Sequence, residues 1–321
     1  MLPSKIFPES KSRTNTSAWI ALGAVCIIWG TTYLAIRVSL DAFPPCYLMA
    51  IRYSTSGGLM LLAAKLMGAK MPRGRELWLT SVLGVITIGM GTGLLCVAEE
   101  WIPTGLSALF IATQPFWMVL AQWALSAGSL RPHGATLRGL LVGIVGVAVL
   151  VAPQAVKEGW RGETFLGFLL LQLACAGWVV GALMQKKLDI SAHPVVAGAV
   201  QQFATGIFFF VPAVLFEHTP HPTSWRPIVG MAYLITFGAM IGYSAFVYAM
   251  DRLPAPIVSV YTFVNPVVAV FLGWLFFRER FGIRELCAML LIFAGIAVVK
   301  FSRAAGSLGP NERNPSVAVA D

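Results

Sequence analysis

Two amide side chains stand beside prolines in otherwise apolar stretches of the chain. Gln114 precedes Pro115, and Asn265 precedes Pro266 at the corresponding place in the second half. A proline inside a helix cannot donate to the carbonyl four residues back, so a backbone oxygen near it is free to bond elsewhere. Gln114 and Asn265 are therefore candidate substrate-binding residues, with Pro115 and Pro266 as helix breaks. The alternative is that the amides bond neighbouring helices to one another.

Aromatic side chains with a polar tip form a second group of candidate substrate-binding residues. Most tryptophans of membrane proteins lie at the two interfaces, whereas these lie in the interiors of apolar stretches. Such placement indicates a cavity in which an indole N–H or a phenol O–H meets a polar partner, with core packing as the alternative. The candidates are Trp29, Tyr33, Trp117, Trp178, Tyr243 and Tyr261.

Arg52 is a basic residue inside an apolar stretch. It follows Pro44 by eight residues, which at the helical rise places it about 12 Å deep. Charged groups at that depth face protein or water, where they mark a solute pathway or form a structural ion pair. Its counterpart in the second half is the neutral Gln201. Both roles stay open, and the structural one is slightly favoured.

Acidic residues are missing from the interiors of the apolar stretches. Glu99, Glu100 and Glu279 fall at expected helix ends, so the sequence supports no buried proton carrier. A carboxylate at a wet helix end keeps a pKa of about 4.3 and stays ionised at neutral pH. This lack of a buried acid favours facilitated diffusion or solute exchange over strict proton antiport in any solute transport that the chain performs.

The motifs of common catalytic and cofactor sites do not occur in the sequence. There is no G-x-x-x-x-G-K-[ST] phosphate loop and no H-E-x-x-H zinc motif. Glu217, His218 and His221 could hold a metal only from an exposed loop, which we disfavour. We expect no cofactor, no metal and no enzymatic activity.

The composition requires hydrocarbon as the solvent of this chain. Hydrophobic residues make up 57% of the 321 residues and charged residues 12%, with a mean hydropathy of +0.76. A soluble domain carries about a quarter charged residues. The net charge of +9 needs no nucleic acid as partner, because basic loops match anionic lipid.

Ten apolar runs are long enough to cross a bilayer as helices. Continuous rather than alternating apolarity excludes a barrel. The expected spans are 18–37, 44–66, 77–97, 102–126, 136–152, 164–185, 194–216, 227–249, 254–277 and 283–300.

Basic residues are distributed unequally between the two sides of this ten-span arrangement. Fifteen Lys and Arg lie on the side of both termini and seven on the other. The positive-inside rule then places both termini in the cytoplasm of a multi-pass inner-membrane protein.

The two halves of the chain repeat one pattern. Trp and Pro residues recur in order at an offset of 149 or 151 residues, as in Trp29 and Trp178, Pro45 and Pro194, Pro103 and Pro254, Pro115 and Pro266, and Trp123 and Trp274. Each half holds five helices, and an odd number inverts the second half in the membrane. The sequence thus predicts an all-α integral membrane protein of ten helices in two inverted five-helix repeats. We expect repeats at 18–152 and 164–301, a linker at 153–163, and cytoplasmic tails at 1–17 and 302–321.

These residues resemble the EamA-type permeases of the drug/metabolite transporter superfamily over about residues 18–301. The resemblance rests on Trp29-Gly30-Thr31-Thr32, Pro44-Pro45 with Arg52, Gly105-Leu106 through Pro115, Trp178, Pro254 through Pro266, Gly273-Trp274, Glu279-Arg280 and Gly295. It implies a central cavity lined by helices one, three, four, six, eight and nine. One departure is the turn after the fourth helix, where Ala127-Gly128-Ser129 stands and the glutamate of that turn is absent.

The sequence predicts a secondary transporter that works by alternating access. Its expected partners are the lipid bilayer and a small-molecule substrate, and a homodimer is compatible with the sequence. The resemblance alone suggests amino acids or related amphipathic solutes, exported or exchanged. The alternatives are a non-transporting membrane scaffold and, less favoured, an intramembrane enzyme.

Overall fold

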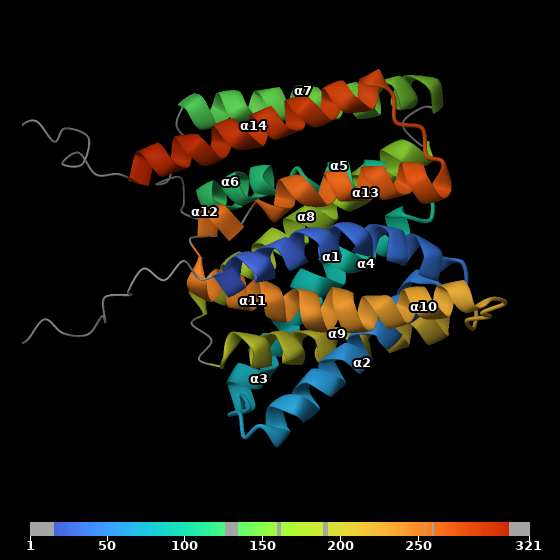
Figure 1. Cartoon of the computed structure of the whole chain (residues 1–321), viewed down its shortest axis with the longest axis vertical. Helices are drawn as coiled ribbons and strands as arrows, with labels where there is room; N and C mark the ends of the chain where they lie inside the picture. The colour runs from blue at the N-terminus through green and yellow to red at the C-terminus, as the bar shows by residue number, and fades with distance from the viewer. Residues whose placement is uncertain are drawn as a thin grey trace, which may run out of the picture.

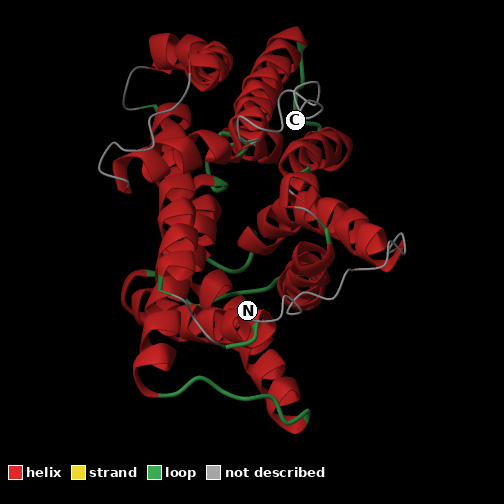
Figure 2. Ribbon diagram, turned by 90° about the vertical axis from the view of Figure 1, so that its left-hand side faces the viewer, coloured by secondary structure: helices red, strands yellow, loops and turns green. Residues whose placement is uncertain are grey.

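The computed structural model describes residues 16–125, 134–158, 162–188, 192–253, 255–258 and 260–307. Within these ranges every regular element is a helix, and Figures 1 and 2 show helices joined by loops. Continuously apolar sequence requires this, because hydrocarbon offers no partner to backbone N–H and C=O groups. The turn at 127–129, Pro254 and most of both tails lie outside the described residues.

The first half contributes five membrane-crossing segments. The first is α1 (Thr16–Leu40) and the second is α2 (Pro45–Leu66). The third joins α3 (Gly74–Gly84), the π-helix η1 (Val85–Met90) and α4 (Gly91–Ala98). The fourth joins α5 (Thr104–Ile111) and α6 (Gln114–Leu125), and the fifth is α7 (Gly134–Glu158).

The second half contributes five more segments. They are α8 (Glu163–Lys187), then α9 (Pro194–Phe216), then α10 (Trp225–Tyr233) with η2 (Leu234–Ile241) and α11 (Gly242–Arg252), then α12 (Ala255–Val258) with α13 (Tyr261–Phe277), and α14 (Ile283–Ser307). Seven of the ten described segments are each long and apolar enough to cross a membrane, and α13 is a shorter apolar helix. The predicted ten-helix fold is confirmed.

Corresponding helices of the two halves pack against each other, α2 against α9 and α7 against α14. Glycines let their backbones approach: a Cβ on Gly57 would overlap the backbone of Phe203, and one on Gly139 would lie 2.8 Å from the carbonyl oxygen of Gly295. Small residues at helix crossings are the usual way in which membrane helices pack closely. The α7–α14 pair forms one edge of the bundle, at the top of Figure 1.

A π-helical segment interrupts the third segment of each half at the corresponding place, as η1 and η2. Such segments shift the backbone pairing by one residue and are frequent at functional sites. Nothing in the apolar pattern predicts them. Their matched positions show that the inverted repeats share local backbone geometry as well as helix order.

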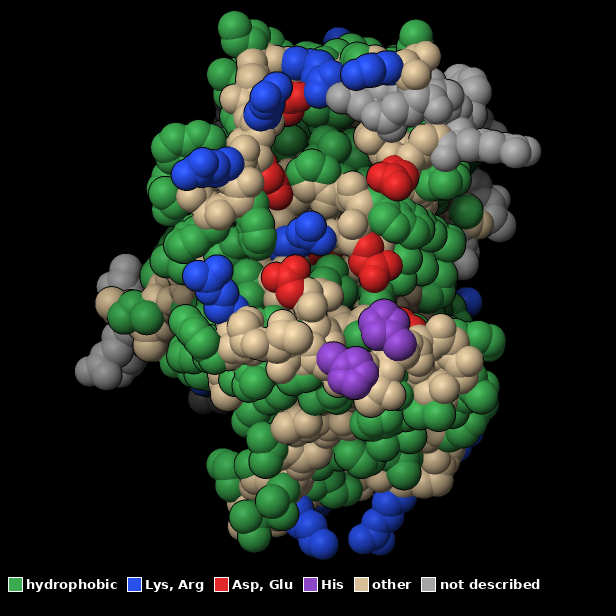
Figure 3. Space-filling view, turned by 90° about the vertical axis from the view of Figure 1, so that its right-hand side faces the viewer, with side chains coloured by type: hydrophobic (Ala, Val, Ile, Leu, Met, Phe, Trp, Pro, Cys, Tyr) green, Lys and Arg blue, Asp and Glu red, His purple; other side chains and the backbone are tan. Residues whose placement is uncertain are grey.

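Charged side chains gather at the ends of the bundle, while its sides are apolar. Large apolar residues such as Ile20 and Val214 are exposed along the helices. Figure 3 views the end where α1 finishes and α2 begins, and shows basic, acidic and histidine side chains next to one another there. The start of α1 and the finish of α14 share the opposite end, as ten crossings require (Figure 1).

Candidate functional site

A cavity of about 1010 Å³ lies between the two halves. At one end, which we call the open end, it reaches Asp251 and Arg252, and the side chain of Asp251 is 70% exposed. It stops at Ile36 and Leu95, which are 1% and 8% exposed, before reaching the other end, which we call the closed end. In this conformation a solute reaches the cavity from one side of the bundle.

Most of the residues singled out in the sequence line this cavity. Its walls come from the first, third, fourth, sixth, eighth and ninth membrane-crossing segments, as the resemblance implied. The second and seventh segments contribute as well. The predicted residues found there are Trp29, Tyr33, Arg52, Gln114, Trp178, Tyr243, Tyr261 and Asn265.

Trp117 does not line the cavity. Its indole Nε1 donates to Oε1 of Gln172 on α8 at 2.9 Å. The side chain therefore faces the neighbouring helix, where Gln172 accepts the hydrogen bond of its indole N–H. Its sequence-based assignment to the substrate site is not supported by this placement.

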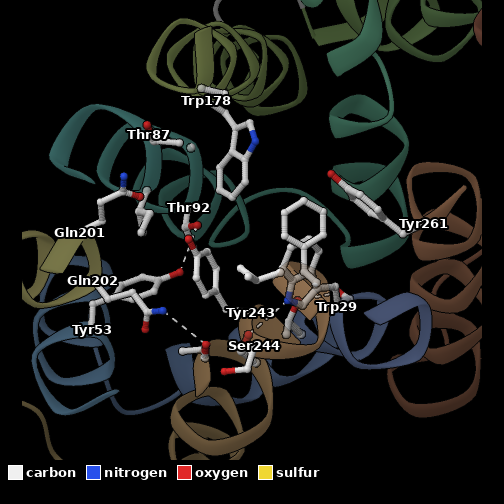
Figure 4. A pocket seen from close by; sticks show the side chains of 18 of the residues that line it. Trp29, Tyr53, Thr87, Thr92, Trp178, Gln201, Gln202, Tyr243, Ser244 and Tyr261 are labelled. Atoms are coloured by element: carbon white, nitrogen blue, oxygen red, sulfur yellow. Dashed lines mark hydrogen bonds between the residues drawn. The ribbon is translucent and has the colours of Figure 1, made fainter. Parts of the chain in front are cut away.

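Aromatic rings form one wall of the cavity, and we call Trp29, Phe246 and Tyr261 the aromatic group. The ring centroid of Trp29 lies 5.2 Å from that of Phe246 and 5.2 Å from that of Tyr261, the latter edge to face. Figure 4 shows Trp29, Trp178, Tyr243 and Tyr261 directed toward a common space. Such rings offer an apolar surface with polar edges to an amphipathic solute.

The opposite wall is polar, and the sequence patterns did not single out most of its residues. Tyr53 donates to Oγ1 of Thr92 at 3.3 Å, and Gln201 donates to Oε1 of Gln185 at 3.0 Å. The hydroxyl of Thr87 is buried without a hydrogen-bond partner among the described residues. Figure 4 shows Tyr53, Thr87 and Gln201 across the space from Tyr261. For Gln201 the sequence did offer a signal, because it occupies the position in the second half that corresponds to Arg52.

Pro115 coincides with a break in the fourth segment. α5 ends at Ile111, α6 begins at Gln114, and the carbonyl of Ile111 accepts from Sγ of Cys175 at 3.7 Å. Pro266 differs, because α13 continues through it and the ninth segment is interrupted earlier, before Tyr261. The expected symmetry of the breaks is therefore displaced by several residues in the second half.

Asn265 ties α13 to α1. With its amide nitrogen as donor, it bonds the carbonyl of Tyr261 at 3.1 Å and the carbonyl of Cys26 at 3.0 Å. Its side chain is 8% exposed and still borders the cavity. Asn265 can therefore bond two helices to each other, which is the alternative role considered for both amides. Gln114 is half-buried and lies at the cavity wall.

Comparison with known proteins agrees with this architecture. The EamA-like transporter family matches residues 16–152 and again 165–301. The chain belongs to the EamA-like transporter family. The "Uncharacterized inner membrane transporter YedA" of Escherichia coli strain K12 is 27% identical over 287 residues, with 87% of this chain and 89% of that one covered.

Two further relatives and one solved structure are similar to this chain over most of its length. "Protein PecM" of Dickeya dadantii is 25% identical, covering 87% of this chain and 91% of its own. The "Probable amino-acid metabolite efflux pump" of Escherichia coli strain K12 is 25% identical, covering 86% and 92%. A crystal structure at 22% identity has a TM-score of 0.64 and covers 91% of this chain and 99% of that one. It shows that the two chains share a fold.

At the closed end of this EamA-like transporter, a carboxylate of one half caps a helix of the other. Glu279 accepts from the backbone N–H of Thr104 at 2.7 Å and of Gly105 at 3.0 Å. Gly273 leaves room for this carboxylate, because a Cβ there would overlap its oxygen, and a Cβ on Gly105 would press on Val270 at 3.0 Å. Arg278 is left-handed (φ 54°, ψ 32°) and ends α13 there. This arrangement gives a structural role to Gly273 and Glu279, two of the residues on which the family resemblance rests.

A second carboxylate makes the same kind of contact at the closed end. Glu217, after α9, accepts from the backbone N–H of Cys46 at 2.8 Å and of Tyr47 at 3.0 Å. Free N–H groups and the positive end of the helix dipole both favour a carboxylate at a helix start. The two halves are therefore joined at this end by two charge-assisted caps.

The structure contradicts the expectation that Glu99 is a solvent-exposed carboxylate with a usual pKa at a helix end. Glu99 follows the last residue of α4, is 1% exposed, and neither carboxylate oxygen has a hydrogen-bond partner among the described residues. Burial and the neighbouring Glu279 raise the pKa of Glu99 well above its usual range, while Arg37 lowers it. Sequence position alone could not show this environment, because Tyr33, Arg37 and Glu279 lie near Glu99 in the fold and far from it in the sequence.

Proposed function

We propose that this chain is a secondary transporter that moves small amphipathic metabolites, amino acids among them, by export or exchange through alternating access. The observation that carries the proposal is the cavity between the inverted halves, open at one end and closed at the other by contacts between the halves. The relative named as a probable amino-acid metabolite efflux pump favours amino acids within this class.

The cavity opens at the end where α1 begins. With the orientation predicted from basic residues, this is the cytoplasmic side, from which an exporter loads its solute. Aromatic rings on one wall and amides and hydroxyls on the other suit a solute with an apolar body and a polar head. A non-transporting scaffold has no need for a cavity of this kind.

Solute flux in proteoliposomes tests the proposal. We expect the purified protein to accelerate counterflow of at least one amino acid or related amphipathic solute above protein-free liposomes. Absence of flux for every amino acid and amphipathic solute tested would contradict it.

Cysteine labelling tests the cavity separately from flux. In a cysteine-free background, Ala174→Cys places a thiol at the cavity wall and Ala213→Cys places one at a buried site away from it; both alanines are 0% exposed. We expect a hydrophilic thiol reagent to modify the first much faster than the second. Equal, slow modification would favour the scaffold.

A further inference from the structure

Arg52 lies in the cavity wall with part of its guanidinium unpaired. The residue is 5% exposed, and its Nε and Nη1 have no hydrogen-bond partner among the described residues. The ion pairs of the described part of the chain, Asp251 with Arg252 and Glu285 with Arg284, do not include it. Its Cζ lies 4.7 Å from the ring centroid of Tyr53, which supplies no negative charge. A buried charge without a partner is strongly destabilising. Because Arg52 borders the cavity, an anion bound there would supply the missing counter-charge.

The guanidinium and the aromatic group meet at Gly238 in η2. Nε1 of Trp29 donates to the carbonyl oxygen of Gly238 at 3.2 Å, and a Cβ on Gly238 would lie 3.2 Å from Nη2 of Arg52. Glycine at this position therefore lets the arginine and the indole lie against one residue. When the anionic group of a solute binds Arg52, the rest of that solute lies near the rings of Trp29, Phe246 and Tyr261.

The charges around the cavity favour an anion over a cation. Among the described lining residues, Asp251 is the acidic one, and it sits at the open end, paired with Arg252 at 2.9 Å. Gln201, the counterpart of Arg52 in the second half, is neutral and bonds Gln185. The inner part of the cavity thus carries one positive charge that no described acidic side chain offsets.

We propose that Arg52 recognises a carboxylate of the transported solute while the aromatic group holds its apolar or aromatic body. The inference rests on the proposed transport function and narrows its substrates to amphipathic organic carboxylates, with or without an amino group. The planar guanidinium fork matches the two oxygens of a carboxylate, and a bond between two charged groups is stronger than one between neutral groups. A cationic amine without a carboxylate finds no counter-charge at this place.

Binding of three matched ligands tests the proposal on the full chain in lipid nanodiscs. Phenylacetate carries the carboxylate, phenylacetamide is its neutral counterpart of the same shape, and phenethylamine is a cation; calorimetry measures each affinity. We expect phenylacetate to bind at least about tenfold more tightly than either of the others, the scale of one charge-assisted hydrogen bond. Equal affinity for phenylacetate and phenylacetamide in the unaltered protein would overturn the proposal.

Two substitutions assign the preference to Arg52. Arg52→Gln should abolish the difference between phenylacetate and phenylacetamide, and Arg52→Lys should keep part of it, since lysine retains the charge without the fork. Arg284→Gln is the matched control, because that arginine is paired with Glu285 outside the cavity. Thermal melting establishes that each variant is folded. A full carboxylate preference in folded Arg52→Gln would also overturn the assignment.

The outcomes separate this proposal from the transport function. Flux of amphipathic carboxylates that is unaffected by Arg52→Gln leaves transport standing and rejects the carboxylate site. Carboxylate-selective binding that depends on Arg52, without flux of any solute, supports the site and rejects transport.

Discussion

The carboxylate of Glu279 accepts a hydrogen bond from the backbone N–H of Thr104 across the two halves of the molecule, at 2.7 Å. The bond joins the chain after α13 to the first residue of α5 at the closed end. Because Glu279 also accepts a hydrogen bond from Gly105, loss of its charge weakens both bonds of this cap between the halves.

Glu279→Gln should open the closed end more often. A charged cap at a helix start contributes about 1 kcal/mol, so we expect a several-fold faster reaction of a cysteine placed at Ile102, which is 2% exposed. The readout is labelling by a membrane-impermeant thiol reagent from the closed side. Glu285→Gln is the control, since Glu285 accepts from the N–H of Gly282 at the start of its own helix, α14. An unchanged labelling rate in Glu279→Gln would refute the role of this cap.

Glu99 should make the stability of the protein depend on pH. Its pKa is raised by burial and by Glu279 and lowered by Arg37. The stabilising contribution of the neutral acid is complete below the ordinary pKa of about 4.3 and is lost as pH rises toward the raised pKa. We therefore expect the melting temperature to fall with rising pH more steeply in the natural protein than in Glu99→Gln.

Melting between about pH 5 and pH 8 measures this difference. Tyr33, Arg37 and Glu279 surround Glu99 electrostatically, so each variant is compared at equal salt concentration. Glu163→Gln, an exposed acid at the start of α8, is the control. Parallel pH profiles for the natural protein and Glu99→Gln would show that Glu99 is ionised in the fold.

The two amides beside the prolines should respond differently to replacement by leucine. Asn265→Leu removes the bonds to Cys26 and Tyr261, and we expect a loss of stability of about 1–3 kcal/mol along with weaker solute binding. Gln114→Leu should weaken binding with little change in stability, because Gln114 is half-buried at the cavity wall. Melting curves and the KM of flux separate the two effects. Normal transport by both variants would place the substrate site elsewhere.

Gly57→Ala should destabilise the contact between α2 and α9. The added Cβ would overlap the backbone of Phe203, so the helices must separate at an expected cost of about 1–3 kcal/mol. Gly23→Ala is the matched control, because nothing lies within 4 Å of the added atom. A melting temperature equal to that of Gly23→Ala would mean that these helices are not in close contact.

Reporter fusions test the predicted orientation. Fifteen basic residues on the side of the termini against seven on the other predict that fusions at Lys11 and at Asn314 both report the cytoplasm. A periplasmic signal from either site would reverse the side on which the cavity opens.

The sequence by itself determined the helical membrane fold and the inverted repeat. Apolar runs of membrane length must be helical in hydrocarbon, and an odd number of helices in each half must invert the second half. It also placed most of the cavity residues, because tryptophan, tyrosine and amide groups inside such runs require polar surroundings. Trp29 and Tyr261 show this, since both line the cavity.

The tertiary structure alone decided which of those side chains face the cavity and which acids are buried. Trp117 turns to Gln172 on a neighbouring helix, and residue type does not reveal that direction. Glu99 is covered by residues far away in the sequence, including Arg37 and the region of Glu279. Arg52 lacks a carboxylate partner in the described fold, which depends on where every acidic side chain comes to lie. Burial and pairing arise from contacts between distant segments, and local sequence patterns do not contain them.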